Sequence, residues 1–256
     1  MSPNRQSDEI AFGDRKIILP DTPRPVMEII RDNIVHDGFF IAPHFYIAEF
    51  IDEIIDQLER HKALRYQEQM DSGFNLVTSI PFIKDLAYSQ QLISLVKQVL
   101  GENTFPTNAF VLDKTLDHNW GLDWHQDLKI SVKKKIETQG FNNWTTESGI
   151  THTIPPKEIL EKRLSVRIHL DNCFVENGAI LIAPRSHESG ILRNRTEIEQ
   201  IVATETRYCE IEKGGVMFMM PLLLHKSPYS ITNKNRRTLQ IEYAGTDLEN
   251  GLQWYS

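Results

Sequence analysis

The sequence is short of three features, and each absence excludes a class of protein. Only two of its 256 residues are cysteines, Cys173 and Cys209, and neither belongs to a CxxC motif, which argues against a disulfide scaffold and a zinc–cysteine site. No run of about 18 apolar residues occurs, and the N-terminal segment MSPNRQSDEIAFGDRK has no apolar signal core. We therefore expect a cytoplasmic protein that makes no contact with a membrane.

A stripe of positive charge is also missing. The net charge is −7 and residues of both signs are spread along the chain, whereas a nucleic-acid surface would need a basic stripe. What is present is an ordinary globular composition, with 40% hydrophobic and 25% charged residues. A chain of this length can bury a sizeable core without disulfides or a structural metal.

The first part of the chain shows the periodicity of amphipathic helices. In YIAEFIDEIIDQLERH, and in an earlier segment that ends near Gly38, apolar residues recur three and four positions apart. A third helix is expected from Ser89 to Leu100, with Ser89 as its N-cap and Gly101 as its terminator. The apolar stripes comprise Val26, Ile29, Ile30 and Ile34 in the earlier helix, and Ile47, Phe50, Ile51, Ile54, Ile55 and Leu58 in the longer one.

From Phe105 onward the pattern changes to short β-rich runs separated by turns. The runs are TNAFVLDKT, DWHQDLKISV, LSVRIHLDN, GAILIAPRS, VATETRYCEI, GVMFMMPLLLH and RRTLQIEYAG. Many short strands in series are typical of a sandwich or jelly roll. Because no linker separates helices from strands, we expect a single domain over residues 1–256, with a helical part at about 22–104 and a jelly-roll core at about 105–246.

The segment WHQDLKIS contains a candidate metal-binding pair. His125 and Asp127 stand two apart in a stretch that reads as a strand, so their side chains are expected on one face. An imidazole and a carboxylate suit a divalent first-row metal, and a second, distant histidine would complete the 2-His-1-carboxylate set of non-haem Fe(II) enzymes. The alternative is two polar residues on a solvated sheet face. His169 and Asp171 have the same spacing, so the residues alone leave this second pair open, although complete alternation explains their strand without a metal.

His225 is the strongest candidate for the distant histidine. It ends the apolar run GVMFMMPLLLH, a turn follows, and Arg236 opens the next strand eleven residues later. An arginine in that place can bind a carboxylate through two parallel hydrogen bonds. The alternative is that Arg236 and Arg237 form a solvated pair after the turn. The combination of His-x-Asp, distant histidine and arginine is more specific than any one of its parts.

With these motifs the sequence resembles the phytanoyl-CoA dioxygenase family of Fe(II)- and 2-oxoglutarate-dependent oxygenases. The resemblance runs from about Asn108 to Trp254 and rests on VLDK, WHQD, RIHLDNCFVENGAILIAPRSHESG, GGVMFMMPLLLHKS and NRRTLQIEYA. It implies a mainly β protein with flanking helices, whose core is a double-stranded β-helix, or jelly roll. It also places His169 and Asp171 on a later core strand and not at the iron.

The resemblance implies a role for each matching residue. Arg236 and Ser227 correspond to the pair that holds the distal carboxylate of 2-oxoglutarate, and Lys114 and Arg167 are expected to line the cosubstrate site. The implied iron ligands are His125, Asp127 and His225.

The implied reaction uses Fe(II), O2 and 2-oxoglutarate to hydroxylate a C–H bond, with release of succinate and CO2. Halogenating relatives lack the carboxylate ligand, so Asp127 favours hydroxylation. We expect a small-molecule substrate, and no feature of the sequence selects among CoA esters, amino acids and other metabolites. The alternatives are a cupin-type metal-dependent enzyme without 2-oxoglutarate, which would have no use for Arg236, and a jelly-roll binding protein.

The segment from Lys133 to Lys162 does not fit as strand, because it is rich in Gly, Asn, Thr and Pro. We expect a long insertion that covers the substrate side of the iron, since long ordered loops tend to carry function. Its expected hinges are Gly140 and Gly149, and its expected apolar lining is Trp144, Ile150 and Ile154. Further candidates for the mouth of the pocket are Trp144, His152, Trp254 and Tyr255.

Overall fold

The structure is a computed structural model. It describes residues 8–12, 15–19, 24–71, 75–115, 118–147 and 149–255, with side chains described from residue 27 onward except for 62–71. An antiparallel hairpin near the N-terminus, β1 (Asp8–Phe12) and β2 (Arg15–Leu19), was not expected from the sequence. The described helices include none that is both long enough and apolar enough to span a bilayer. The cytoplasmic location stays a prediction.

The three expected helices are present, and two short ones accompany them. The helices of this part are α1 (Arg24–Asp37), α2 (Ala48–Asp71), α3 (Leu76–Ser79), α4 (Pro81–Ala87) and α5 (Gln90–Leu100). The Ser89 side chain accepts a hydrogen bond from the backbone of Leu92 at the start of α5, and Gly101 ends that helix with φ +96°. Both boundaries of α5 were therefore correctly predicted from capping residues alone.

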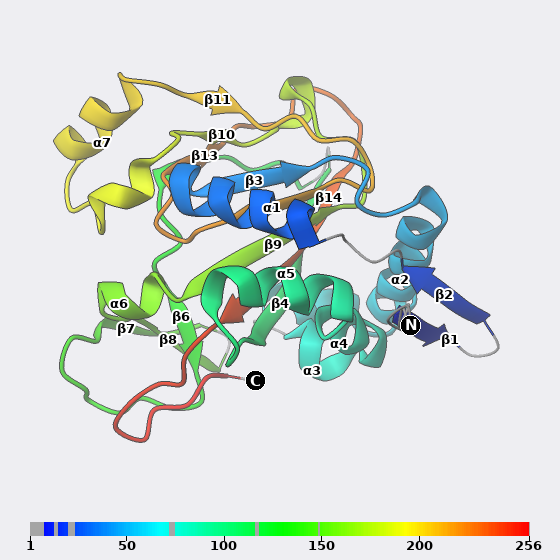
Figure 1. Ribbon diagram of the computed structural model, residues 1–256, viewed down its shortest axis with the longest axis horizontal. Helices are drawn as coiled ribbons and strands as arrows, with labels where there is room; N and C mark the ends of the chain where they lie inside the picture. Colours follow the sequence, from blue (N-terminus) through cyan, green and yellow to red (C-terminus); the bar gives the residue numbers. More distant parts are fainter. Residues whose placement is uncertain are drawn as a thin grey trace.

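Two antiparallel sheets form the core, as Figure 1 shows. The larger sheet has the order β3-β12-β9-β14-β4, and the smaller has the order β11-β10-β13-β5. This architecture, a jelly roll flanked by helices, confirms the predicted fold class. The strands are β3 (Phe39–Ala42), β4 (Phe105–Lys114), β5 (Leu122–His125), β9 (Arg163–His169), β10 (Leu181–Ile182), β11 (Arg207–Tyr208), β12 (Val216–Met219), β13 (His225–Ser227) and β14 (Arg236–Ala244).

The two faces of the larger sheet differ in chemistry because side chains alternate along each strand. The outer face lies against helices α1 and α5 (Figure 1) and belongs to the main apolar core. Its central residues are Leu164, Val166, Ile168, Leu239, Ile241 and Tyr243. The inner face of the same two strands is polar and consists of Arg163, Ser165, Arg167, His169, Arg236, Thr238, Gln240 and Glu242. Buried polar groups need partners, so this inner face is where a ligand site is expected.

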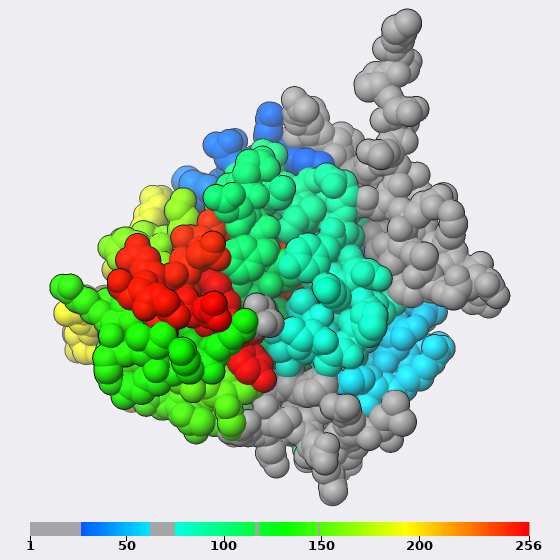
Figure 2. Space-filling view, turned by 90° about the horizontal axis from the view of Figure 1, so that it is seen from below, coloured from blue at the N-terminus to red at the C-terminus, as the bar shows by residue number. Residues whose placement is uncertain are grey.

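The segment 133–162 contains regular structure, so the expectation of an insertion without strands was wrong. A third sheet has the order β6-β8-β7, with β6 at Ile130–Val132, β7 at Asn142–Glu147 and β8 at Ile150–Ile154, and α6 (Lys157–Leu160) follows. β-Branched threonine and isoleucine favour strands here. The sheet also packs on a small apolar cluster that includes Trp254. Figure 2 shows the C-terminal segment lying against this part of the chain, where Trp254 forms a β-bridge with Val132.

The run VATETRYCEI was also misassigned as a single strand. Its first residue, Val202, ends helix α7 (Arg195–Val202), and its second residue, Ala203, follows the helix. Strand β11 is limited to Arg207–Tyr208. The Asn194 side chain caps α7 by accepting a hydrogen bond from the backbone of Glu197. That capping signal competes with the β-rich composition that follows. Two 3-10 helices, Val175–Asn177 and Ser186–Ser189, complete the connections around β10.

Candidate metal and cosubstrate site

A cavity of ≈ 450 Å³ lies between the two sheets of the jelly roll. Both sheets contribute to its wall: His125 and His225 come from the smaller sheet, and Arg167 and Arg236 come from the larger one. Asp127, Lys129 and Ile154 extend the wall toward the third sheet. Of the seven residues predicted for the metal and cosubstrate sites, all but Lys114 line the cavity.

His125, Asp127 and His225 converge in this cavity. Each offers one ligand atom, and these atoms all lie within 4.8 Å of one another. Nε2 of His125 is 3.8 Å from Oδ1 of Asp127, and Nε2 of His225 is 3.7 Å from the same oxygen. The two histidines are cross-strand partners of β5 and β13, which explains why residues a hundred positions apart meet here.

The prediction that His125 and Asp127 share one face of a strand was wrong. Strand β5 ends at His125, so Asp127 does not share a strand face with it. Asp127 is held instead by its backbone, whose N–H donates to the carbonyl of Pro221 at 2.9 Å. Gln126, between the two, fastens the segment by donating to the carbonyls of Gly190 and Leu222 at 2.8 and 2.7 Å.

Both histidines present the nitrogen that a metal would need. Nδ1 of His125 lies 2.7 Å from the carbonyl oxygen of Asp123, and Nδ1 of His225 lies 3.0 Å from that of Leu223. A carbonyl only accepts, so each Nδ1 carries the proton and each Nε2 keeps its lone pair toward Asp127. Burial lowers the pKa of His225 to about 4, so this imidazole is neutral at pH 7 and available as a ligand.

The carboxylate of Asp127 divides its two oxygens between different neighbours. Oδ1 faces the histidines, whereas Oδ2 accepts a hydrogen bond from Arg167 at 3.3 Å. Burial acts to raise the pKa of Asp127, but in the acid range where this carboxyl titrates, the protonated His225 and the guanidinium of Arg167 outweigh burial and hold the pKa below its ordinary value. The group is thus an anion that one arginine orients, and with the two imidazoles it forms a donor set that suits Fe(II).

The second His-x-Asp pair does not join this cluster. Asp171 is bound to Arg237, whose Nε and Nη2 donate to its two oxygens at 2.9 Å each. Burial, with the charges of Arg236 and Arg167, lowers the pKa of His169 to about 3. Among the described residues, only one cluster of His, Cys, Asp and Glu side chains has metal-binding spacing, and it contains neither residue.

At one end of the cavity, Arg236 in the wall lies beside a second buried cation, Lys114. Lys114 is 0% exposed, Arg236 is 3% exposed, and the two are cross-strand partners on β4 and β14. Nζ of Lys114 and Nη2 of Arg236 both donate to Oγ of Ser227, at 3.1 and 3.3 Å. The ring of Trp120 lies 4.3 Å from Nζ of Lys114. Within the described part of the chain, neither cation forms an ion pair with a carboxylate.

The proximity of two positive charges changes their proton affinity. Burial, together with the charge of Arg236, lowers the pKa of Lys114 from 10.5 to about 7. Burial also lowers the pKa of Arg236. Buried charges without a partner are unfavourable, so this end of the cavity fits an anionic group supplied from outside the chain.

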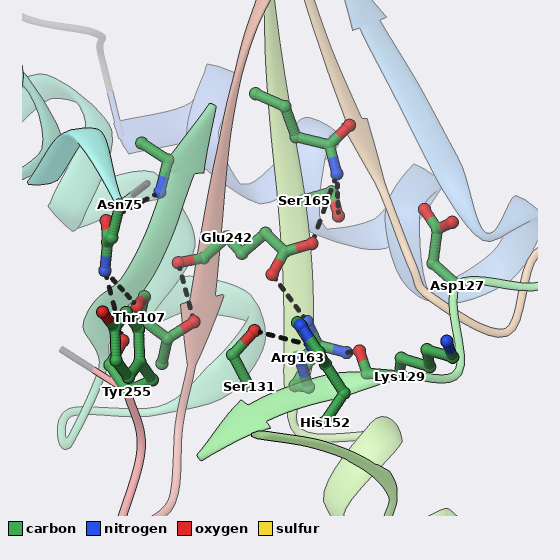
Figure 3. A network of polar contacts seen from close by, with 12 residues as sticks. Asn75, Thr107, Asp127, Lys129, Ser131, His152, Arg163, Ser165, Glu242 and Tyr255 are labelled. Carbon is green, nitrogen blue, oxygen red and sulfur yellow. Dashed lines mark hydrogen bonds and ion pairs between the residues drawn. The ribbon is translucent and has the colours of Figure 1, made fainter. Parts of the chain in front are cut away.

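At the opposite end of the cavity, Glu242 in the wall forms an ion pair with Arg163. Arg163 is 2% exposed and donates from Nη2 to Oε2 of Glu242 at 2.9 Å, and its Nη1 donates to the carbonyl of Lys129 at 3.3 Å. Figure 3 shows Arg163 between these two partners. Burial, the larger influence, raises the pKa of Glu242 against the opposing charge of Arg163.

Sequence reasoning missed Trp120, Gln240 and Glu242 in the wall of the cavity. Glu242 and Gln240 follow Arg236 at steps of two along β14, so strand alternation could have placed all three on one face. Trp120 lies before β5 and had no such signal. The segment from Lys133 to Lys162 contributes Ile154 to the wall.

The residues suggested for the mouth of the pocket lie elsewhere, so that expectation was wrong. Trp254 is 5% exposed and packs with Trp144 in the apolar cluster of the third sheet. His152 approaches Oγ of Ser131 at 3.2 Å, and the Tyr255 carbonyl accepts from Asn75 at 3.2 Å (Figure 3). None of the four lines the cavity. Large aromatic side chains on the third sheet and the tail serve its packing instead.

Comparison with solved structures gives the same fold in several 2-oxoglutarate-dependent enzymes. The epimerase SnoN, in complex with Fe3+, alpha ketoglutarate and nogalamycin RO, superposes with a TM-score of 0.65 at 15% identity over 87% of this chain and 84% of that one. EctD from S. alaskensis, with 2-oxoglutarate and 5-hydroxyectoine, gives 0.67 at 14% identity over 87% and 76%. The carbocyclase SnoK from nogalamycin biosynthesis gives 0.63 at 13% over 86% and 84%.

A family comparison is more specific than these structural likenesses. No curated protein sequence matches the chain significantly. The model of the phytanoyl-CoA dioxygenase (PhyH) family, however, matches residues 34–238, a span that contains the three converging side chains and the paired cations. The chain therefore belongs to the phytanoyl-CoA dioxygenase family, and it is a 2-oxoglutarate-dependent non-haem iron enzyme whose cofactor and cosubstrates are Fe(II), 2-oxoglutarate and O2.

Proposed function

We propose that this enzyme hydroxylates an unactivated C–H bond of a small-molecule metabolite and releases succinate and CO2. His125, Asp127 and His225 bind the iron in this proposal. The observation that carries it is the meeting of two imidazole Nε2 atoms and one carboxylate oxygen within 4.8 Å, in a cavity that has a pair of unneutralised cations at one end. Three ligands leave coordination positions for the cosubstrate and O2.

Arg236, Ser227 and Lys114 bind the distal carboxylate of 2-oxoglutarate in this proposal. Two cations and a hydroxyl converge on one region, where Ser227 Oγ lies 3.1 Å from Lys114 Nζ and 3.3 Å from Arg236 Nη2. A carboxylate placed there would neutralise charge that the chain leaves without a partner. A cupin-type metal enzyme that does not use 2-oxoglutarate would have no occupant for this end of the cavity.

When bound, the iron supplies the capacity to activate O2 for oxidation of the substrate. The chain's own residues provide the surroundings for that chemistry. Arg167 binds Asp127 Oδ2 at 3.3 Å and thereby orients the free oxygen toward both histidines. The backbone carbonyls of Asp123 and Leu223 fix the two imidazole tautomers. Trp120 forms part of the cavity wall at the cationic end, with its ring 4.3 Å from Nζ of Lys114.

Hydroxylation is proposed over other oxidative outcomes. The similar structures include an epimerase and a carbocyclase, so the jelly roll by itself does not choose the product. The carboxylate of Asp127 occupies the position that a halide would need, which argues against halogenation. A cavity of ≈ 450 Å³ suits a small molecule. Product analysis by mass spectrometry should show a gain of one oxygen atom, derived from O2.

The direct test of this site is anaerobic addition of Fe(II) and 2-oxoglutarate. The wild type should show the weak visible charge-transfer band of the chelate. His125→Ala and His225→Ala should lose the band and weaken Fe(II) binding by at least about a hundredfold, because even partners outside the ligand shell contribute about ten- to a hundredfold.

The matched control is His169→Ala, which removes a buried histidine of the second His-x-Asp pair. Its iron affinity should match that of the wild type. Unchanged iron affinity in both His125→Ala and His225→Ala, or loss of affinity in the control alone, would contradict the ligand assignment. Equilibrium dialysis with Fe(II) gives the comparison without any turnover.

A further inference from the structure

The cavity contains a polar wall that the metal and cosubstrate sites leave unused. Gln240 and Glu242 both line it, and both lie on the inner face of β14. Gln240 is the cross-strand partner of Arg167, the residue that contacts Asp127. The wall therefore lies beside the proposed iron site, on the side away from the Lys114 and Arg236 pair, where a primary substrate must reach.

Gln240 has a hydrogen-bond acceptor with no partner. The residue is 2% exposed, and its Oε1 is buried without a hydrogen-bond partner. Its Nε2 makes only long contacts, at 3.5 Å to Ser165 Oγ and 3.4 Å to Glu242 Oε1. A buried amide oxygen left without a donor is unfavourable, so a rotation of this amide that brings the oxygen to a donor group of a ligand would stabilise the bound ligand.

Glu242 adds a second acceptor to the same wall. Its Oε2 is taken by Arg163 at 2.9 Å, whereas Oε1 has only the 3.4 Å contact from Gln240. The two acceptor oxygens, Gln240 Oε1 and Glu242 Oε1, thus belong to side chains in contact with each other. Neither has a short hydrogen bond within the described part of the chain.

The charges around this wall are already neutralised, which restricts the ligand. Glu242 pairs with Arg163, and Asp127 pairs with Arg167. Lys129 pairs with Glu147 at 2.7 Å. A charged substrate group would be buried here without an opposite charge of its own, whereas a neutral donor would satisfy the acceptors at no such cost.

We propose that Gln240 and Glu242 form the subsite that binds a hydroxyl group of the primary substrate, and that this substrate is a small, neutral, hydroxyl-bearing molecule. Apolar residues face the rest of the same space, namely Phe110, Leu112, Leu128 and Ile154. The substrate therefore presents a carbon framework to these side chains and its hydroxyl to the acceptors. This inference rests on the proposed function, because it assumes that the remaining cavity is occupied by iron and 2-oxoglutarate.

The test uses the enzyme loaded anaerobically with Fe(II) and 2-oxoglutarate and four ring-shaped probes. The probes are cyclohexane-1,4-diol, cyclohexane-1,4-dione, cyclohexylammonium and cyclohexanecarboxylate. Their dissociation constants are measured by ligand-observed NMR. The diol should bind about tenfold more tightly than the dione, since one hydrogen bond to a buried acceptor contributes about that factor, and both ions should bind more weakly than the diol.

Substitutions then assign the preference to the wall. Gln240→Leu should bind the diol and the dione with similar affinity, and Glu242→Gln should narrow the difference. Thr238→Val is the matched control, because Thr238 lies two residues earlier on the same face, is 1% exposed and has an unpartnered hydroxyl, yet does not line the cavity. It should keep the wild-type preference. Gln240→Leu replaces a residue of similar size without removing a charge, so it tests the wall even where Glu242→Gln folds poorly.

Separate results test the iron and cosubstrate site and the hydroxyl subsite. Absence of the charge-transfer band in the wild type would contradict the iron and cosubstrate assignment. A normal band overturns the hydroxyl subsite instead if the diol binds no better than the dione, if an ion binds more tightly than the diol, or if Gln240→Leu keeps the preference.

Discussion

A buried arginine lies at each end of the cavity, and the two are in opposite situations. Arg163 is 2% exposed and forms an ion pair with Glu242, while Arg236 is 3% exposed and lies beside a second cation, Lys114. The charge of the first arginine is neutralised by the chain itself. The second shares the hydroxyl of Ser227 with Lys114 and has no described carboxylate partner. Equal burial with unequal pairing distinguishes an arginine whose charge the chain neutralises from one whose charge, as we propose, a ligand neutralises.

The largest expected effect concerns the end of the cavity where Arg163 and Glu242 form an ion pair. Arg163→Leu leaves the carboxylate of Glu242 buried without its partner, which destabilises proteins by roughly 3–5 kcal/mol. Urea denaturation should show this loss in the free energy of unfolding. The double variant Arg163→Leu/Glu242→Leu should recover much of it, because neither charge is then left alone. A double variant as unstable as Arg163→Leu would contradict the pairing argument.

At the cationic end of the cavity, substitution of the arginine should affect ligand binding and not stability. Arg236→Leu should not lower the free energy of unfolding, since it removes a buried charge that has no ion-pair partner in the described structure. It should weaken 2-oxoglutarate binding by roughly tenfold to a hundredfold, because a hydrogen bond to a charged group contributes about 1.5–3 kcal/mol. Calorimetry on the iron-loaded, oxygen-free enzyme measures this affinity.

Arg237→Leu is the control for that variant. Arg237 points to the other face of β14, where it binds Asp171. The substitution should therefore leave 2-oxoglutarate affinity nearly unchanged. If Arg237 proved to be the sensitive residue, the assignment of Arg236 to the cosubstrate would be wrong.

A smaller effect follows from the depressed pKa of Lys114. Without ligand, the folded protein holds this group with a pKa of about 7, whereas its ordinary value is 10.5. Between these values the unfolded chain binds more protons, so the free energy of unfolding should rise as the pH is raised through this window. Since a carboxylate favours the protonated amine, 2-oxoglutarate binding should take up a proton and weaken as the pH rises above about 7.

Lys114→Met checks the origin of that pH dependence. In this variant the dissociation constant of 2-oxoglutarate should be larger at pH 7 than in the wild type. It should also change less between pH 7 and pH 9. A dependence as steep as that of the wild type would assign the titration to another group. Calorimetry in buffers of different ionisation enthalpy counts the protons directly.

The smallest effect concerns the third sheet. We expect residues 133–162 to cover the substrate side of the iron, because Ile154 lines the cavity and Lys129 is tied to Glu147 on β7. Limited proteolysis within this segment should be slower with iron, 2-oxoglutarate and a bound diol probe than without them. Equally slow cleavage in every state would indicate a fixed sheet and not a mobile cover.

Much of the framework was predictable because it depends on local signals. Ser89 and Gly101 marked the ends of α5, and the stripe of Phe50, Ile51 and Ile54 marked the core face of α2. The role of strand alternation was equally visible in Arg236 and Arg237, whose side chains separate to opposite faces of β14. Each of these features depends only on residues close together in the sequence.

The features that could not be predicted depend on contacts between distant segments. Arg163 and Glu242 are 79 residues apart and meet only because β9 pairs with β14. A backbone hydrogen bond from Asp127 to the carbonyl of Pro221, and not strand geometry, holds Asp127 near the histidines. Trp144 of β7 packs on the cluster that contains Trp254, a contact between distant segments, so the polar, glycine-containing sequence of residues 133–162 gave no sign of β7 and β8.

The central claim is that the cationic end of the cavity binds the distal carboxylate of 2-oxoglutarate. The most direct measurement compares 2-oxoglutarate with 2-oxopentanoate, which has a methyl group in place of that carboxylate, on the oxygen-free Fe(II) enzyme. The wild type should prefer 2-oxoglutarate by about a hundredfold, and Arg236→Leu should lose most of that preference. Equal affinity for both acids in the wild type, or an unchanged preference in Arg236→Leu, would contradict the account.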